Sequence, residues 1–338
     1  MTNLDFENAD AGALPGTRKH SRIPGVDAVR ATAGFQRGML VVGAGIVLFF
    51  AIVAVFASWI APYGFNDDRA NGKVFGRLIG PSSDHWFGTT SGGEDVYSRV
   101  VFGAQTALEV ILLAVAISIV VGVPLGLVSG YLGGWLDRVL VLITDALFAF
   151  PSLLLAIIVN IAIAGGTSSK LGGILAAAIS ITVVYVPQYF RVVRNATVAA
   201  REQPYVEAAR ALGASPRVVM TRYVFGNVVQ TVPVIATINA GDAILTLAGL
   251  GFLGYGIEPS VGAEWGHDLS KAVSDTAANI WWTGLYPGVA IVLIVVGVTL
   301  VGESLNDVLN PLLRTFKVSQ VVLPQRSPSE ASSEEGGQ

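Results

Sequence analysis

Six apolar runs, each long enough to cross a lipid bilayer as a helix, dominate this chain of 338 residues. At a rise of 1.5 Å per residue, a helix needs about 20 residues to cross the hydrocarbon layer of roughly 30 Å. In lipid, backbone polar groups are satisfied only within helices or closed barrels. We therefore expect an all-α integral membrane protein with six transmembrane helices, at residues 38–61, 106–130, 139–165, 171–193, 228–254 and 285–309.

The composition agrees with a membrane protein and limits the chemistry that the chain can perform. Hydrophobic residues make up 52% and charged residues only 13%, against about 25% charged in an ordinary soluble domain. There is no cysteine, and the three histidines have no metal-ligand spacing, so no metal site is expected. No phosphate-binding G-x-x-x-x-G-K-[ST] motif occurs. If ATP drives this protein, another chain must bind the nucleotide, and this chain carries no cofactor.

Basic residues indicate the orientation of the spans. With both termini in the cytoplasm, only six of the 21 Lys and Arg residues would lie outside, as the positive-inside rule requires. We expect a cytoplasmic tail at 1–36, a permease domain at 37–314 and a disordered cytoplasmic tail at 315–338. The domain would contain an outer loop at 62–105 and a cytoplasmic loop at 194–226.

Within the cytoplasmic loop, residues 203–217 predict two helices joined by a sharp turn. Pro204 suits a first helical turn, and Gly213 can adopt the left-handed conformation that ends a helix. Ser215 is then an N-cap, with Pro216 as the first residue of the next helix. The same pattern resembles the corner of a DNA-binding helix-turn-helix. The apolar flanks and the formal net charge of −3 argue against a nucleic-acid partner.

The order Glu207-Ala208-Ala209, three residues, Gly213 and then Ala214-Ser215-Pro216 resembles the EAA loop of permease subunits in ATP-binding-cassette importers. In that family the loop is a coupling helix seated in a groove of the ATPase. The resemblance implies that Glu207 is the polar anchor at the ATPase groove. It also implies that Ala208 and Ala209 allow close approach to the ATPase and that Gly213 permits the turn. The implied coupling residues are Glu207, Ala208, Ala209, Arg210, Gly213, Ser215 and Pro216. The chain departs from the family at Val224-Phe225-Gly226, where Ile-Leu-Pro is usual.

Within the outer loop, the stretch from His85-Trp86-Phe87-Gly88 to Ser98-Arg99 resembles the C-type subunit of the dipeptide, oligopeptide and nickel branch. Three positions depart from it, because Thr90, Glu94 and Gln105 stand where relatives usually have Asp, Arg and Arg. The resemblance implies a type I (MetI-like) permease for di- or oligopeptides in the bacterial inner membrane. It also implies four kinds of partner: membrane lipid, a second homologous permease, one or two ATPases that bind ATP and Mg²⁺, and an extracytoplasmic binding protein.

Several polar residues have a functional and a structural interpretation. Asp95, Ser98 and Arg99 either contact a docked binding protein or cap and brace a short interfacial helix. Asp242 and its neighbour Asn239, inside the fifth run, either line the translocation path, where Asp242 could bind a peptide ammonium group, or hydrogen-bond within the bundle.

One ion pair and two alternative functions complete the expectations. Asp145 is expected to pair with Arg138 near the cytoplasmic end of the third run. Within the branch, the alternative substrate is nickel. Outside it, the alternative is a secondary transporter driven by an ion gradient, although such folds have no ATPase-docking loop.

Overall fold

The computed structural model describes residues 34–70, 72–164 and 169–309. The expected tail 315–338 lies outside the described residues. Residues 1–33 of the expected tail 1–36 also lie outside them. The described residues form helices and one short antiparallel ribbon of β1 (Arg69–Ala70) and β2 (Lys73–Val74). The helices are α2 (Gly34–Val55), α3 (Ala57–Ile60), α4 (Val96–Leu132), α5 (Gly134–Phe148), α6 (Ser152–Ala164), α7 (Lys170–Arg201), α8 (Pro204–Ala211), α9 (Pro216–Val218), α10 (Phe225–Val228), α11 (Val232–Phe252), α12 (Trp265–Ala277) and α13 (Trp282–Leu309).

Five helical runs of the described residues are long and apolar enough to cross a membrane: Gln36–Val55, Val96–Leu132, Lys170–Arg201, Pro216–Phe252 and Trp282–Asn306. The predicted third run is different, because α5 and α6 meet at a bend of 98°. Pro151 lies in this bend, where its ring and missing N–H prevent a continuous helix. The described residues contain six spans if this broken pair is counted as one span, and otherwise five.

Two predicted spans are extended by helical residues that the hydropathy pattern did not include. α4 begins at Val96, ten residues before its predicted start, because Asp95 caps it with a side-chain hydrogen bond. The fifth span begins at Pro216 and passes through a π-helical stretch at Val219–Val224 and a 3₁₀ turn before α11. The described loops are consequently shorter than the predicted ones.

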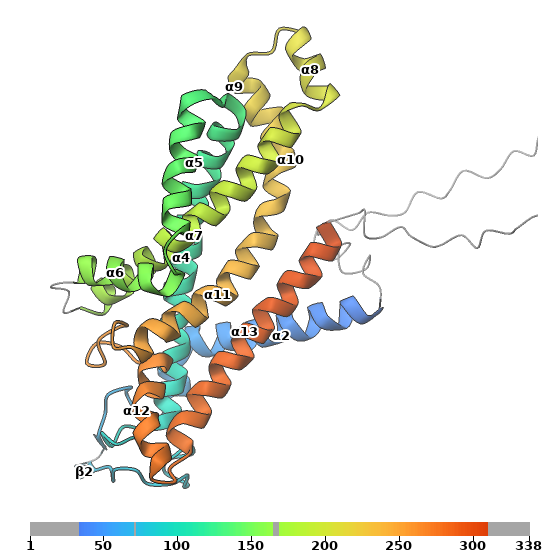
Figure 1. The fold of residues 1–338 in the computed structure, drawn as a ribbon. Helices are drawn as coiled ribbons and strands as arrows, with labels where there is room; N and C mark the ends of the chain where they lie inside the picture. The colour runs from blue at the N-terminus through green and yellow to red at the C-terminus, as the bar shows by residue number, and fades with distance from the viewer. Residues whose placement is uncertain (1–33, 71, 165–168, 310–338) are drawn as a thin grey trace, which may run out of the picture.

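Figure 1 shows α8 and α9 at one end of the molecule and α12 with β2 at the other; we call these the α8 end and the α12 end. α4 contains 37 residues and is about 55 Å long at the usual helical rise. It packs along α7, while α13 packs against α2 and α11. A single helix thus reaches from the α12 end toward the α8 end.

Three glycines spaced four residues apart bring α4 and α7 into direct contact. A Cβ on Gly122, Gly126 or Gly130 would lie 2.6–2.8 Å from atoms of α7, among them the backbone oxygens of Phe190 and Arg194. Small residues allow such close helix packing in lipid, where burial of apolar surface gives little net drive. The α4–α7 pair therefore forms the tightly packed centre of the bundle.

Candidate functional site

The predicted coupling loop consists of α8 followed by a tight turn. Pro204 is in the first turn of α8, where its missing N–H leaves no hydrogen bond unmade. Gly213 has φ 81°, a left-handed conformation that favours glycine. Its N–H donates to the carbonyl of Arg210 at 2.9 Å, and the N–H of Ala214 donates to the carbonyl of Ala209 at 3.0 Å. The expected helix and turn are both present.

The side chains of α8 divide between an inner and an outer face. Val206 and Ala209 are buried against the rest of the chain. Glu207, Ala208 and Arg210 are exposed. Glu207 and Ala208 are therefore accessible to a partner protein, whereas Ala209 packs behind them.

The chain beyond the turn continues into a membrane span. Ser215 is at the N-cap position before Pro216, but its side chain makes no capping hydrogen bond. Ser215 and Pro216 are both exposed. The helical run that begins at Pro216 continues to Phe252. The turn after α8 therefore leads directly into the helical run that contains α11.

Arginines attach the α8 end to α4. Arg201, just before α8, donates from Nη1 to the carbonyl of Gly130 at 2.9 Å. The guanidinium of Arg210 lies over the ring of Tyr131, 5.6 Å from its centroid. Both contacts reach the last residues of α4, so α8 is connected to the helix that extends to the α12 end.

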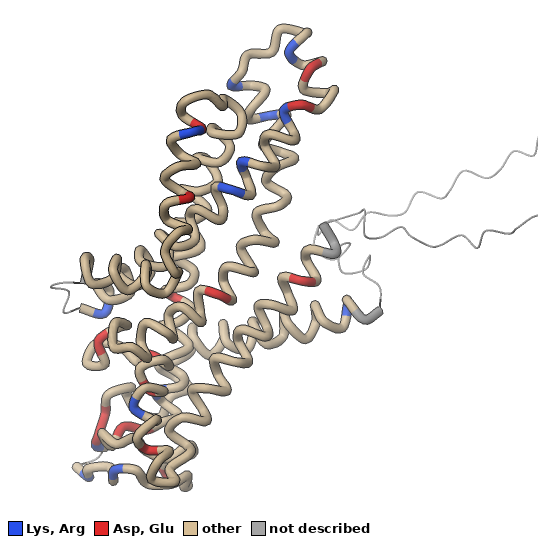
Figure 2. The backbone as a smooth tube through the Cα atoms, viewed as in Figure 1, with Lys and Arg blue, Asp and Glu red and all other residues tan. Residues whose placement is uncertain are grey.

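A charged pair that the sequence analysis missed lies beside these contacts. Arg194 of α7 binds Asp137 of α5 through Nε–Oδ1 at 2.5 Å and Nη2–Oδ2 at 2.7 Å. The hydroxyl of Ser129, from α4, donates to the same carboxylate at 2.5 Å. Three helices thus meet at Asp137. Figure 2 shows Lys and Arg gathered around α8, α9 and the adjoining ends of α5 and α7.

The expected pair of Arg138 with Asp145 is wrong. Asp145 Oδ1 instead lies 2.9 Å from Nη2 of Arg191 on α7. Arg138 and Asp145 are seven residues apart on one helix, which separates them by about 10 Å along the axis. Both residues of the observed pair are exposed for half of their side-chain surface, so the pair adds little stability.

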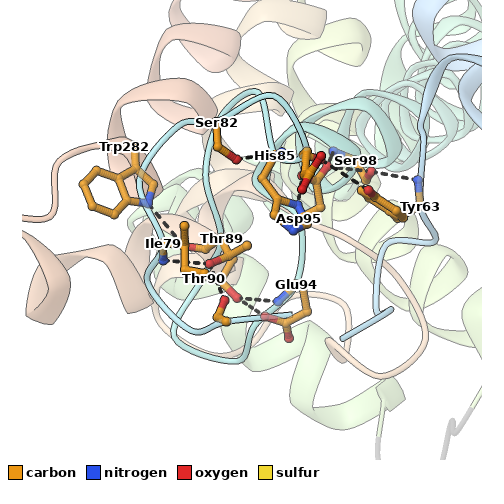
Figure 3. Close-up of polar contacts among 12 residues, drawn as sticks. Tyr63, Ile79, Ser82, His85, Thr89, Thr90, Glu94, Asp95, Ser98 and Trp282 are labelled. Carbon is orange, nitrogen blue, oxygen red and sulfur yellow. Dashed lines mark hydrogen bonds and ion pairs between the residues drawn. The ribbon is translucent and has the colours of Figure 1, made fainter. Parts of the chain in front are cut away.

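At the α12 end, Asp95 is the centre of a buried polar cluster (Figure 3). Its carboxylate accepts hydrogen bonds from the N–H and Oγ of Ser98, both at 2.8 Å, and lies 2.9 Å from Nδ1 of His85. The N–H of Tyr63 donates to Ser98 Oγ at 3.3 Å. These contacts agree with the interpretation that Asp95 caps a helix. The capped helix is the long α4 and not a short interfacial helix.

Arg99 is buried next to this cluster and contacts a distant part of the chain. Its Nε and Nη2 donate to Oδ1 of Asp268 on α12, at 2.9 and 2.6 Å. Its Nη1 donates to the carbonyl of Phe65 at 3.0 Å. The side chains of Asp95, Ser98 and Arg99 are all buried, so they hold the loop and α12 to the start of α4.

The three divergent positions make contacts with one another or with nearby residues. The Thr90 hydroxyl donates to the carboxylate of Glu94 (Figure 3). Burial opposes ionisation of Glu94, but this hydrogen bond and the charge of Arg99 outweigh it and lower its pKa. Gln105 accepts a hydrogen bond from Nζ of Lys170 at 3.5 Å. Thr90 and Glu94 therefore form a local hydrogen-bonded pair.

Asp242 and Asn239, three residues apart on α11, differ in burial. Asp242 is exposed in the single chain and lines a groove of about 320 Å³ between α11 and α13. Asn239 is buried, and its amide lies beside the hydroxyl of Tyr189 without meeting hydrogen-bond geometry. Glu303 also lines the groove, and the sequence analysis did not single it out. The groove therefore combines two carboxylates in a membrane segment.

Comparison with known proteins connects these features. Residues 122–315 match the family described as binding-protein-dependent transport system inner membrane component. Residues 35–81 match the N-terminal TM domain of oligopeptide transport permease C. The first match contains both α8 and the groove.

Several relatives are similar over most of the chain. The glutathione transport system permease protein GsiD of Shigella flexneri serotype 5b (strain 8401) is 39% identical over 285 residues, which cover 82% of this chain and 88% of the relative. The GsiD proteins of Escherichia coli O6:K15:H31 and Shigella dysenteriae serotype 1 are 37% and 38% identical with the same coverage.

Proposed function

The chain belongs to the family of inner-membrane components of binding-protein-dependent transport systems, and we propose that it conducts small peptides and is driven by a separate ATPase through α8. Membership makes it a permease subunit of an ATP-binding-cassette importer, of the type of oligopeptide transport permease C, in the bacterial inner membrane. It is the membrane component of that importer and not the ATPase. Such a system contains an ATPase and a substrate-binding protein as partners.

The observation that supports coupling through α8 is its projecting, two-faced form. Glu207 and Ala208 are exposed at the tip of the molecule, while Val206 and Ala209 hold the helix to the bundle. The direct continuation from Pro216 to Phe252 supplies a path from that contact to the groove at Asp242. ATP and Mg²⁺ would be bound by the ATPase. Closure of the ATPases around ATP would displace α8, and the bundle would alternate between two openings.

The substrate class rests on the relatives and on the charge of the groove. The relatives are named as glutathione permeases and the N-terminal match as an oligopeptide permease domain. Asp242 and Glu303 line a groove without a basic residue, and a carboxylate in a membrane segment is typically functional. We infer that Asp242 binds the ammonium group of a small peptide as it passes.

The proposed orientation places the α8 end in the cytoplasm with both termini, and the α12 end outside. The concentration of basic residues around α8 and α9 supports it (Figure 2). The exposed groove supports a second permease subunit, because one chain leaves Asp242 open on a face within the membrane segment. The partner would close that face, and a heterodimer of two related permeases is the proposed form.

Uptake into proteoliposomes tests this function. The complex is purified with every protein that accompanies the chain and reconstituted with its binding protein, and uptake of a labelled dipeptide, labelled glutathione and nickel is compared. ATP-dependent uptake of a peptide is the expected result. The Asp242→Asn variant is expected to reduce peptide uptake at least tenfold, whereas Glu202→Gln, which removes an exposed carboxylate between α7 and α8, should leave it unchanged.

Other outcomes would identify another function. Uptake of nickel without uptake of either peptide would show that the importer carries nickel and not peptides. Transport that follows an ion gradient without ATP would replace the importer mechanism altogether. Normal peptide uptake by Asp242→Asn would remove this residue from the translocation path while leaving the importer assignment in place.

A further inference from the structure

Glu264, immediately before α12, is the most deeply buried acidic side chain of the described residues whose carboxyl lacks a basic partner. The residue is 3% exposed. It is the N-cap of α12, where Oε1 accepts a hydrogen bond from the N–H of Gly266 at 3.1 Å. Oε2 is buried without any hydrogen-bond partner among the described residues. An ionised carboxylate in such a place would be costly.

Two glycines make the space that this carboxyl occupies. A Cβ on Gly251, at the end of α11, or on Gly256, in the following loop, would overlap the carboxyl of Glu264. α11 ends with the N–H of Gly254 donating to Gly251 and that of Tyr255 donating to Leu250. The end of α11 is thus shaped around the Glu264 side chain.

The two residues after Glu264 fit equally close gaps. The indole N–H of Trp265 donates to the carbonyl of Val100 in α4 at 3.0 Å, and a Cβ on Gly103 would overlap the same indole. A Cβ on Gly266 would overlap the backbone of Ala248 in α11. The residues from Glu264 to Gly266 therefore hold the start of α12 against both α4 and α11.

We propose that Glu264 is a positioning residue for transport: as the neutral acid it holds α12 against α11 and α4, and loss of its proton favours release of α12. Release would also separate Asp268 from Arg99 and so free the start of α4. Because α4 extends to the contacts of Arg201, the protonation state of one carboxyl would influence the helix that is attached to α8.

The charges around Glu264 favour the neutral form. Burial is the largest effect, the nearby carboxylate of Asp268 on α12 acts in the same direction, and together they raise the pKa of Glu264 to about 8. The N–H groups of Gly266 and His267 and the charge of Arg99 on α4 oppose this rise. The Arg99 guanidinium is already occupied by Asp268. Gly251, the α11 residue beside the carboxyl of Glu264, carries no charge.

The sign of the pH dependence follows from linkage. The packed state keeps its proton up to about pH 8, whereas a released Glu264 would lose it near its ordinary value of 4.5. The equilibrium constant for release of α12 therefore increases by up to about tenfold for each pH unit above 4.5, and it stops changing above about pH 8. A neutral isostere at this position would remove the dependence.

Cysteine reactivity can measure release, because the natural chain has no cysteine. Ala272→Cys places a thiol on the buried face of α12, at a side chain 3% exposed, while Val273→Cys places one at a position 60% exposed. The full-length chain in lipid nanodiscs is labelled with a maleimide between pH 6 and 9.5. Dividing the labelling rate of the thiol at position 272 by that of the thiol at position 273 cancels the change in thiolate fraction.

The ratio is expected to rise by up to about tenfold per pH unit from pH 6 and to level off above about pH 8. Glu264→Gln should give a low ratio at every pH, and Glu264→Ala a high one, because it leaves the glycine space empty. His267→Gln should keep the rise, because burial and the charge of Lys271 hold the pKa of His267 below its ordinary value. A flat ratio in the natural background, a rise that persists in Glu264→Gln, or a rise lost in His267→Gln would each overturn the proposal.

Discussion

Arg99 of α4 and Asp268 of α12 are joined by two hydrogen bonds of 2.9 and 2.6 Å, although 169 residues separate them in the chain. The pair connects the start of the longest described helix to the only helix of the described loop between α11 and α13. At the other end, the carbonyl of Gly130 is bound by Arg201. α4 is therefore held at both ends by arginine contacts between helices.

Removal of one member of this pair should be more damaging than removal of both. Asp268→Ala leaves the buried Arg99 guanidinium unpaired and should lower the free energy of unfolding by about 3–5 kcal/mol. Arg99→Met combined with Asp268→Leu should recover most of that loss. Thermal unfolding of the purified chain measures both effects.

The exposed pair of Arg69 with Asp68 is the matched control, since both side chains are largely exposed. Their replacement by alanine should not change the unfolding midpoint measurably. If Asp268→Ala were as mild as this control, the pair would not hold α12 to α4.

Asp95 should be needed for the start of α4. Asp95→Ala removes the acceptor for two Ser98 groups and the partner of His85, and should cost at least about 1 kcal/mol for the lost cap alone. Proteolysis within residues 64–94 should become faster as the loop separates from α4. Asp95→Asn, which keeps one oxygen acceptor, should be intermediate, and Asp84→Ala, at an exposed position, should be neutral. Equal proteolysis of all four proteins would show that the cap does not fix the loop.

The glycine contact between α4 and α7 should not tolerate a larger side chain. A Cβ at Gly126 would lie 2.6 Å from the carbonyl oxygen of Phe190, so Gly126→Leu must separate the helices and should cost at least about 1–3 kcal/mol. Gly45→Leu on α2 is the control, because nothing lies within 4 Å of its Cβ position. Size-exclusion profiles and unfolding midpoints of the two variants should differ clearly, and similar values would contradict close α4–α7 packing.

The sequence was most informative where local rules determine the structure. Proline at a first turn and glycine at a positive φ fix α8 and its turn through backbone geometry alone, and Pro204 and Gly213 behave accordingly. Hydropathy located five of the six predicted spans, because the solvent itself imposes the length of each run.

The sequence was less informative where contacts depend on the arrangement of helices. The break at Pro151 reorients α6 by an angle that local pattern cannot supply. Asp145 was assigned to the wrong arginine because Arg191 approaches it from another helix. The burial of Glu264 depends on Gly251 and Gly256, which only the folded chain brings to its carboxyl.

Coupling through α8 is the central claim, and site-specific cross-linking tests it most directly. Because the natural chain has no cysteine, Leu212→Cys carries a single benzophenone maleimide at a position 89% exposed beside the coupling turn, and Val273→Cys carries it on α12. After illumination of the assembled importer, position 212 should cross-link to the ATPase and position 273 should not. An intact complex in which position 212 captures no ATPase would contradict the account.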